Sequence, residues 1–146
     1  MLGFCITKLQ PKRGFMIVGL GTDIDEIERI EAKVPSAHID GLQANRLAKR
    51  VLTTAEFALF IASSTPARYL AKRFAAKEAA AKALGTGIGR GVSFQHIEIS
   101  NNVNGAPLIA FTDGAAARLA ELGAKHAHIS IADEQRYATA TVILES

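Results

Sequence analysis

The sequence predicts one α+β domain in which an antiparallel sheet packs against a long central helix. Three observations predict it: a long helical segment at 66–84, short strand-like segments on both sides of it, and no internal boundary or low-complexity segment in 146 residues. A chain of this length buries about 68% of its unfolded surface, which suffices for one core without a disulfide or structural metal. We expect one domain over 16–146, with 1–15 as a flexible N-terminal extension.

Hydrophobic spacing and turn residues divide the domain into its elements. Short apolar or alternating runs between turn residues favour strands, whereas apolar residues every three or four positions favour helices. The predicted strands are 16–23, 94–100, 107–111, 126–132 and 137–144, and the predicted helices are 25–33, 42–52, 66–84 and 113–122, with another short helix between Thr53 and Ser63.

Local signals support the two elements that matter most. Thr65-Pro66 is typical of a helix start, and Gly85 lies where a left-handed residue would end that helix. In the first strand, Gly19 and Gly21 mark positions where the backbone approaches something closely. Asp23 then falls at the exit of this strand.

Composition limits the possible classes of protein. The single Cys5 cannot form an internal disulfide and favours a reducing compartment, so the cytoplasm is the simplest location. No apolar run approaches the roughly 20 residues of a membrane-spanning helix, so we expect no membrane association. The absence of Trp, of interleaved aromatic residues and of a recognisable motif argues against a nucleic-acid partner.

The net charge is only +3, but the positive charge is concentrated in the middle third of the chain. Such a concentration attracts anions, although any one of these residues could equally be a solvated helix charge. The cations of this stretch are Arg46, Lys49, Arg50, Arg68, Lys72, Arg73, Lys77, Lys82 and Arg90.

Two carboxylates are the strongest candidates for chemistry. Asp23 ends the first strand, and Glu78 lies on the long helix one turn before Lys82. Magnesium is typically held by one or two carboxylates together with substrate phosphates, which suits this pair. Taken alone, Glu78 and Lys82 could also be an ordinary helix ion pair worth about 0.2–0.5 kcal/mol.

From Met16 to Ser146 the chain resembles the bacterial holo-acyl-carrier-protein synthases, which are small phosphopantetheinyl transferases. The resemblance rests on four segments that occur in the same order. They are Gly19-Leu20-Gly21-Thr22-Asp23-Ile24, Phe74-Ala75-Ala76-Lys77-Glu78-Ala79-Ala80-Ala81-Lys82-Ala83, Gly85-Thr86-Gly87 and the closing strand Tyr137-Ala138-Thr139-Ala140-Thr141-Val142. Either of the first two segments alone is a weaker signal than both together.

The resemblance implies the phosphopantetheinyl transferase fold and a magnesium-dependent reaction in fatty-acid biosynthesis. In this reaction the 4'-phosphopantetheine arm of coenzyme A moves to a serine of apo acyl carrier protein, and adenosine 3',5'-bisphosphate is released. It further implies that Asp23 and Glu78 hold the magnesium and that Lys82 neutralises charge at the diphosphate. Glu78 is our choice of general base, so Asp23, Glu78 and Lys82 are the candidate catalytic residues.

The resemblance also suggests contacts for the rest of coenzyme A. Arg73, Lys77 and Arg90 are candidates for the 3'-phosphate, and the glycine loop from Gly85 through Gly87 to Gly91 is a candidate surface for the adenosine. Many relatives carry a His after the Ser-Ile-Ser run of the fourth strand. Here Ala132-Asp133 stands in that place, so no nucleotide contact is predicted from this strand.

Two macromolecular contacts follow from the resemblance. Carrier proteins of this class are acidic, which predicts a basic docking face formed by Arg29, Arg46, Lys49 and Arg50. Members of the family also assemble as homotrimers with active sites between subunits, with Asp23 and Glu78 on opposite sides. The alternatives are a non-catalytic coenzyme A or nucleotide binder, and a basic protein that binds nucleic acid.

Overall fold

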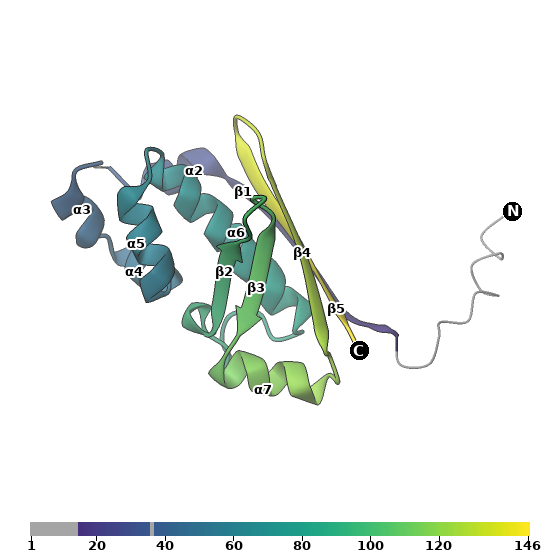
Figure 1. Cartoon of the computed structure of the whole chain (residues 1–146). Helices are drawn as coiled ribbons and strands as arrows, with labels where there is room; N and C mark the ends of the chain where they lie inside the picture. Colours follow the sequence, from purple (N-terminus) through teal and green to yellow (C-terminus); the bar gives the residue numbers. More distant parts are fainter. Residues whose placement is uncertain (1–14, 36) are drawn as a thin grey trace, which may run out of the picture.

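One long helix, α6 (Pro66–Ala83), organises the fold, as the computed structural model shows in Figure 1. The structure describes residues 15–35 and 37–146, so the expected extension at 1–15 lies almost wholly outside it. The other elements, in chain order, are β1 (Ile17–Glu26), α2 (Ile27–Glu31), α3 (Ile39–Gln43), α4 (Arg46–Val51), α5 (Thr54–Ala62), the 3-10 helix η1 (Phe94–His96), β2 (Ile97–Asn101), β3 (Pro107–Phe111), α7 (Asp113–Glu121), β4 (His126–Asp133) and β5 (Tyr137–Glu145).

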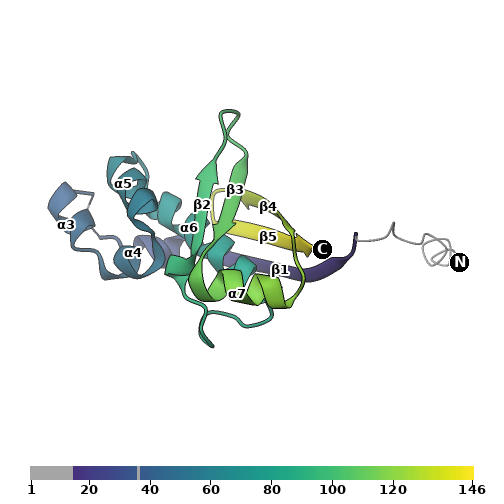
Figure 2. The ribbon, with the colours of Figure 1, turned by 60° about the horizontal axis from the view of Figure 1, so that its bottom comes forward.

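The strands form two antiparallel sheets. The larger has the order β1-β5-β4, and the smaller is the β2-β3 hairpin. Along β5, alternate residues from Ala138 to Leu144 are buried against α6, whereas those between them are partly exposed on the opposite face. Figure 2 shows the hairpin lying across the helix, with its turn projecting from the body. The predicted α+β domain, with an antiparallel sheet against a long helix, is confirmed.

The packing of β1 on α6 depends on two glycines. A Cβ atom at Gly19 would collide with the carbonyl oxygen of Ala83, and one at Gly21 would collide with the carbonyl oxygen of Ala79. The alanines of α6 keep the helix side of this contact equally small. The close approach that the sequence suggested at both glycines is therefore an approach to α6.

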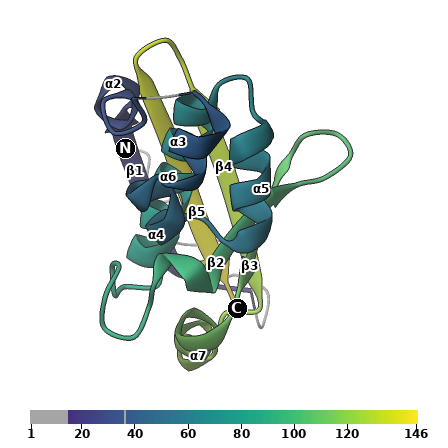
Figure 3. The ribbon, with the colours of Figure 1, turned by 90° about the vertical axis from the view of Figure 1, so that its left-hand side faces the viewer.

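Two apolar clusters flank the helix. One joins the sheets and α7 to the alanine stripe of α6, while the other joins α6 to the short helices α2 to α5. Figure 3 shows α3, α4 and α5 gathered in front of α6, on the side away from the large sheet, and α2 to one side at the end of β1. As a result α6 is buried along much of its length, including Leu70, Ala76 and Ala80.

Several predicted boundaries are correct. Helix α5 begins with a capping box, in which the Thr53 hydroxyl accepts from the Glu56 N–H and the Glu56 carboxylate accepts from the Thr53 N–H. Helix α6 begins at Pro66, and Gly85 follows it with a left-handed φ of 79°. Both signals act within a few residues, which is why the sequence alone located them.

Other boundaries were wrong. The first strand continues to Glu26 because it stays paired with β5 as far as Tyr137, so Asp25 belongs to a strand and not to the predicted helix 25–33. The predicted helix 42–52 is two short helices separated at Asn45, whose side chain accepts a hydrogen bond from the N–H of Ala48 and caps α4.

Replacing Gly21 by alanine should destabilise the protein by about 1–3 kcal/mol, because the added methyl group meets a helix backbone that cannot move aside. Urea denaturation monitored by circular dichroism measures the change. Ser100→Ala, on the exposed side of β2, is the control and should change the free energy of unfolding little. Equal stability of both variants would contradict this account of the β1–α6 contact.

Candidate active site

A group of three carboxylates lies where β1 meets α6. Asp23 and Asp25 are two residues apart on β1, so both side chains point from one face of the strand, and Glu78 approaches from the helix. Lys82 donates to Asp23 Oδ1 at 2.9 Å and to the carbonyl oxygen of Thr22 at 3.0 Å. The lysine therefore ties α6 to β1 beside the carboxylates.

The carboxylates influence one another's ionisation. Burial, together with the nearby charges of Asp23 and Glu78, raises the pKa of Asp25 to about 8. Burial is also the main cause of the raised pKa of Glu78, followed by the charge of Asp23, while Lys82 and Arg50 act in the opposite direction. Burial and mutual repulsion thus both disfavour the ionised forms of Asp25 and Glu78.

The chemistry of this cluster fits a divalent cation. Asp23 Oδ2 and Asp25 Oδ2 are buried and have no hydrogen-bond partner, so each has lone pairs free for a ligand. Within residues 15–35 and 37–146, no three His, Cys, Asp or Glu residues are arranged to enclose a metal ion by themselves. A magnesium ion held by few carboxylates and completed by phosphate oxygens is compatible with both observations.

Asp23 and Glu78 lie near one another in the folded chain. Within a single chain Asp23 and Glu78 are close enough for the charge of one to act on the other. A site completed by a second subunit, with these two residues on opposite sides, stays a prediction. Sequence reasoning missed Asp25, because it was assigned to a helix. The alternation of Thr22, Asp23, Ile24 and Asp25 was the signal that could have extended the strand.

Lys77 does not fit its predicted role at the 3'-phosphate. Its side chain is fully buried, and its ammonium group donates to Glu56 Oε1 at 2.5 Å, to the carbonyl of Val51 at 2.6 Å and to that of Phe94 at 3.1 Å. The second oxygen of Glu56 accepts from the N–H of Ile99. Lys77 is thus a structural residue that joins α6 to α4, α5 and η1, and its assignment to coenzyme A is wrong.

Arg73 lies on a different side of α6 and lines a pocket of about 250 Å³. Only 4% of Arg73 is exposed; its guanidinium group donates to Asn101 Oδ1 at 2.8 Å and lies 4.7 Å from the centre of the Tyr69 ring. Arg73 Nε and the Tyr69 hydroxyl are buried without a hydrogen-bond partner. Unused donors beside a buried positive charge are suited to an anion.

Two further cations, Arg68 and Lys72, line the same pocket. Both contact Asp133 at the end of β4, at 2.8 Å from Arg68 Nη1 to Oδ2 and 3.6 Å from Lys72 Nζ to Oδ1. The sequence placed these two residues in the basic stretch but did not assign them to a site. The spacing of Arg68 and Lys72 was the available signal, because residues four apart lie on one face of a helix.

The remaining predicted ligand contacts are open to solvent. Gly85 and Gly87 have left-handed backbones, with φ of 79° and 65°, and the loop beyond them leads to Arg90, which is exposed. This loop directly follows Lys82 in the chain, at the end of α6 nearest the carboxylates. Its contact with a nucleotide stays a prediction.

The predicted docking residues are all exposed on short helices. Arg46, Lys49 and Arg50 belong to α4, and Arg29 lies on α2 with 83% of its side chain exposed, 3.5 Å from Glu26. Arg50 also stacks on the ring of Phe94 at 5.5 Å. Since the charge of Arg50 lowers the pKa of Glu78, this basic surface borders the carboxylate cluster.

A cluster of carboxylates with a lysine, together with a separate pocket lined by cations, defines a protein that handles a ligand rich in phosphate groups. The family model of the 4'-phosphopantetheinyl transferase superfamily matches residues 19–142, and the chain belongs to this superfamily. No helix among the described residues is long and apolar enough to cross a membrane.

Curated and solved relatives agree with this family. The chain is 79% identical over 131 residues to the holo-[acyl-carrier-protein] synthase of Shewanella halifaxensis, covering 90% of this chain and 100% of the relative. It is also similar to the crystal structure of the Neisseria meningitidis synthase, with a TM-score of 0.77, 38% identity and coverage of 90% and 100%. The Bacillus anthracis synthase, solved in complex with CoA (3',5'-ADP), has a TM-score of 0.71 and 36% identity over 90% of this chain and 98% of that one.

The raised pKa of Asp25 predicts a pH dependence of stability. The folded chain keeps this proton up to about pH 8, whereas the unfolded chain loses it near the ordinary value of 3.8. Because the folded state binds more protons between these values, the free energy of unfolding should fall as the pH rises through this window. In Asp25→Asn this part of the pH dependence should be missing.

Urea denaturation at several pH values between 4 and 9, with a chelator present, measures this effect. Asp40→Asn, which removes an exposed carboxylate from α3, is the matched control and should keep the pH dependence of the unaltered protein. If the free energy of unfolding of Asp25→Asn fell with pH as steeply as that of the unaltered protein, Asp25 would not be the group that titrates.

Proposed function

We propose that this chain transfers the 4'-phosphopantetheine arm of coenzyme A to a serine of apo acyl carrier protein, releasing adenosine 3',5'-bisphosphate. The observation that carries the proposal is the cluster of Asp23, Asp25 and Glu78 beside Lys82, in a chain of this superfamily. The relatives that match over their full length are holo-[acyl-carrier-protein] synthases, which supports the proposal. It places the protein in fatty-acid biosynthesis.

The proposed reaction uses the cluster in the following way. Asp23 and Glu78, with Asp25 beside them, would hold magnesium, which when bound polarises and orients the diphosphate of coenzyme A. The serine oxygen forms a bond to the phosphorus that carries the pantetheine arm, and the bond from this phosphorus to the bridging oxygen breaks. Lys82 stabilises the charge that develops on the departing bisphosphate.

Glu78 is the proposed acceptor of the serine proton. Its pKa is raised by burial and by the charge of Asp23, and a carboxylate with a raised pKa is a better base near neutral pH. It also lies on the side of the cluster next to Arg50, where the carrier protein would arrive. Positioning of the serine and proton removal would thus involve neighbouring residues.

The pocket beside Arg73 is the proposed site for the 3'-phosphate of coenzyme A. At about 250 Å³ it is too small for the whole cosubstrate, but its cations and unused donors suit one phosphate group. In the proposal Arg73 keeps its predicted role, and Arg68 and Lys72 replace Lys77. The glycine loop with Arg90 remains a proposed contact of the nucleotide.

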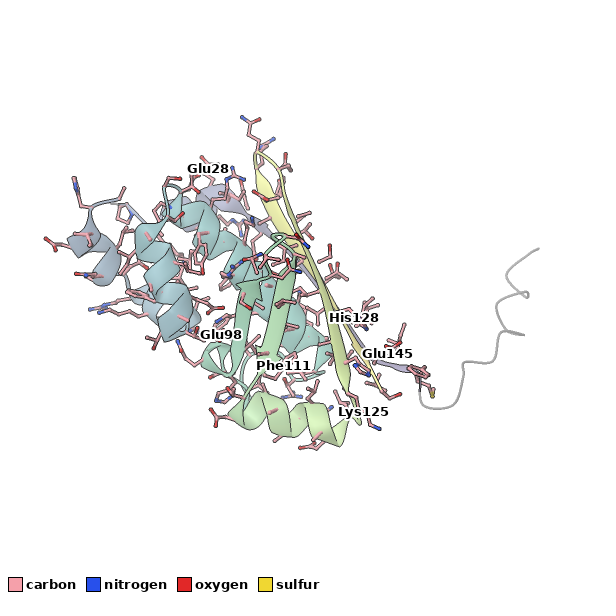
Figure 4. All side chains as sticks on the ribbon, viewed as in Figure 1. Glu28, Glu98, Phe111, Lys125, His128 and Glu145 are labelled. Carbon is pink, nitrogen blue, oxygen red and sulfur yellow. The ribbon has the colours of Figure 1, made fainter. Side chains whose placement is uncertain are left out.

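A homotrimer is the proposed assembly. Leu20 and Ile24 are 63% and 66% exposed on the outer face of the large sheet, and Ile143 lies beside Leu20 in the next strand. Figure 4 shows His128 and Glu145 on β4 and β5, where they are 3.3 Å apart. Exposed apolar side chains of this kind commonly mark a surface that binds another chain, and a neighbouring copy would bring its own pocket toward the carboxylates.

The acidic carrier protein is proposed to dock on Arg29, Arg46, Lys49 and Arg50. Exposed cations on α2 and α4 provide charge complementarity, which mainly favours orientation and rate of association. A location in the cytoplasm belongs to the same proposal and rests on the single cysteine of the chain. A non-catalytic coenzyme A binder is the second candidate, but the orphaned Asp23 and Asp25 oxygens favour the metal-dependent enzyme.

Intact mass spectrometry of apo acyl carrier protein, after incubation with this protein, coenzyme A and magnesium, tests the function. We expect a mass gain of one phosphopantetheine arm, its loss on chelation, and a rate at least about 10²-fold lower in Glu78→Gln, which keeps the fold. Glu121→Gln, on the exposed part of α7, is the control with unchanged rate. Coenzyme A binding without any transfer, on a carrier that another transferase modifies, would instead identify a binder.

Introducing a charge on the outer sheet face should disrupt the proposed trimer. Leu20→Glu places an ion where apolar contacts between copies are proposed, so the mass in solution should fall from three chains toward one. Size-exclusion chromatography with light scattering measures it. Leu59→Glu on α5, a similarly exposed position, should leave the mass unchanged, and a trimer in both variants would place the interface elsewhere.

A further inference from the structure

Two of the cations that line the Arg73 pocket, Arg68 and Lys72, are paired with a carboxylate. Among the described residues, this carboxylate is Asp133 for both. It ends β4 and does not itself line the pocket, but it forms ion pairs with Arg68 and Lys72, which do. A negative side chain at the edge of a site built for an anion has a direct physical consequence. It neutralises part of the attraction that the pocket offers to a ligand.

The two cations that Asp133 contacts differ in how firmly they are held. Arg68 also donates to the backbone carbonyls of Glu134 at 2.8 Å and Gln135 at 3.4 Å, so the β4–β5 turn fixes its guanidinium group. Lys72 makes a longer contact, 3.6 Å, and both partners of this pair are partly exposed. Partly exposed pairs of this length are weak, so an incoming phosphate can replace Asp133 as the partner of Lys72.

The other charged groups near Asp133 leave its contacts with Arg68 and Lys72 in place. The neighbouring Glu134 directs its carboxylate to the N–H groups of Arg136 and Tyr137 within the turn, away from the cations. The hydrogen bond from Arg68 lowers the pKa of Asp133, so its charge is present at neutral pH. Arg73 is paired with the uncharged Asn101 and keeps its full charge.

We infer that Asp133 is a built-in competitor for the 3'-phosphate of coenzyme A: it shares Arg68 and Lys72 with this phosphate and weakens its binding. The inference rests on the proposed function and concerns how tightly this chain holds its cosubstrate. The released bisphosphate carries the same phosphate, so Asp133 also limits product retention. A contact with the 3'-phosphate that is equally strong in substrate and product does not accelerate the chemical step. Excess affinity for this phosphate would only slow release of the bisphosphate.

Removing the charge while keeping the shape isolates this effect. Asp133→Asn should bind coenzyme A about 3- to 10-fold more tightly, because one repulsive charge is lost at a partly exposed site. The gain should be much smaller for dephospho-coenzyme A, which lacks the 3'-phosphate but is otherwise identical. Isothermal titration calorimetry without magnesium measures both ligands on the full chain.

Two further variants control the experiment. Glu121→Gln removes the same charge from a remote, exposed position of α7 and should change neither affinity, which excludes an effect of net charge. Lys72→Gln should weaken coenzyme A binding, and Asp133→Asn added to it should have a smaller effect than on the unaltered chain. Thermal denaturation establishes that each variant is folded.

An unchanged or weaker affinity of folded Asp133→Asn for coenzyme A would overturn the inference, as would an equal gain for dephospho-coenzyme A. Failure of both the unaltered chain and Asp133→Asn to bind coenzyme A would overturn it as well. The transfer of the phosphopantetheine arm to apo carrier protein is measured in a separate assay. A chain that binds coenzyme A with the expected pattern but transfers nothing refutes the proposed function, while the role of Asp133 at the phosphate stands.

Discussion

The close contact between β1 and α6 is the constraint on which the site depends. Gly19 and Gly21 let the strand approach the helix backbone more closely than any side chain would permit. This distance allows Lys82 to reach both the Asp23 side chain and the Thr22 carbonyl, and it brings Glu78 within the electrostatic range of Asp23. Two carboxylates that the chain separates by more than fifty positions thereby act on one another.

The other side of α6 is held by a buried charge. Lys77 and Glu56 form an ion pair without solvent contact, and the backbone groups of Val51, Phe94 and Ile99 complete their hydrogen bonds. Such a pair is tolerated because every donor and acceptor is satisfied, and loss of one partner typically costs about 3–5 kcal/mol. It fixes the rotation of the helix, and with it the direction of the adjacent Glu78.

Side chains of opposite charge therefore lie at different places around α6. Partly buried carboxylates lie where the helix meets β1, whereas Arg68, Lys72 and Arg73 line a pocket near the end of β4. A single small domain separates these two regions, which agrees with the proposal that a neighbouring copy completes the binding of a long, multiply charged cosubstrate. The exposed apolar side chains of Leu20 and Ile24 on the large sheet provide a surface on which such copies could meet.

What the sequence determined by itself was local. The start of α6 at Pro66, its end before Gly85 and the spacing of Glu78 and Lys82 depend on contacts within one or two turns, so they could be predicted together with the α+β class. Only the tertiary structure decided that Lys77 is buried, that Asp25 joins Asp23 and that Asp133 faces Arg68 and Lys72. Each of these depends on a partner from a distant segment: α5 for Lys77, the pairing with β5 for Asp25, and α6 for Asp133. Whether a charged residue is a solvated side chain, an internal ion pair or part of a site depends on the surface that packs against it, and this surface forms only when the chain folds.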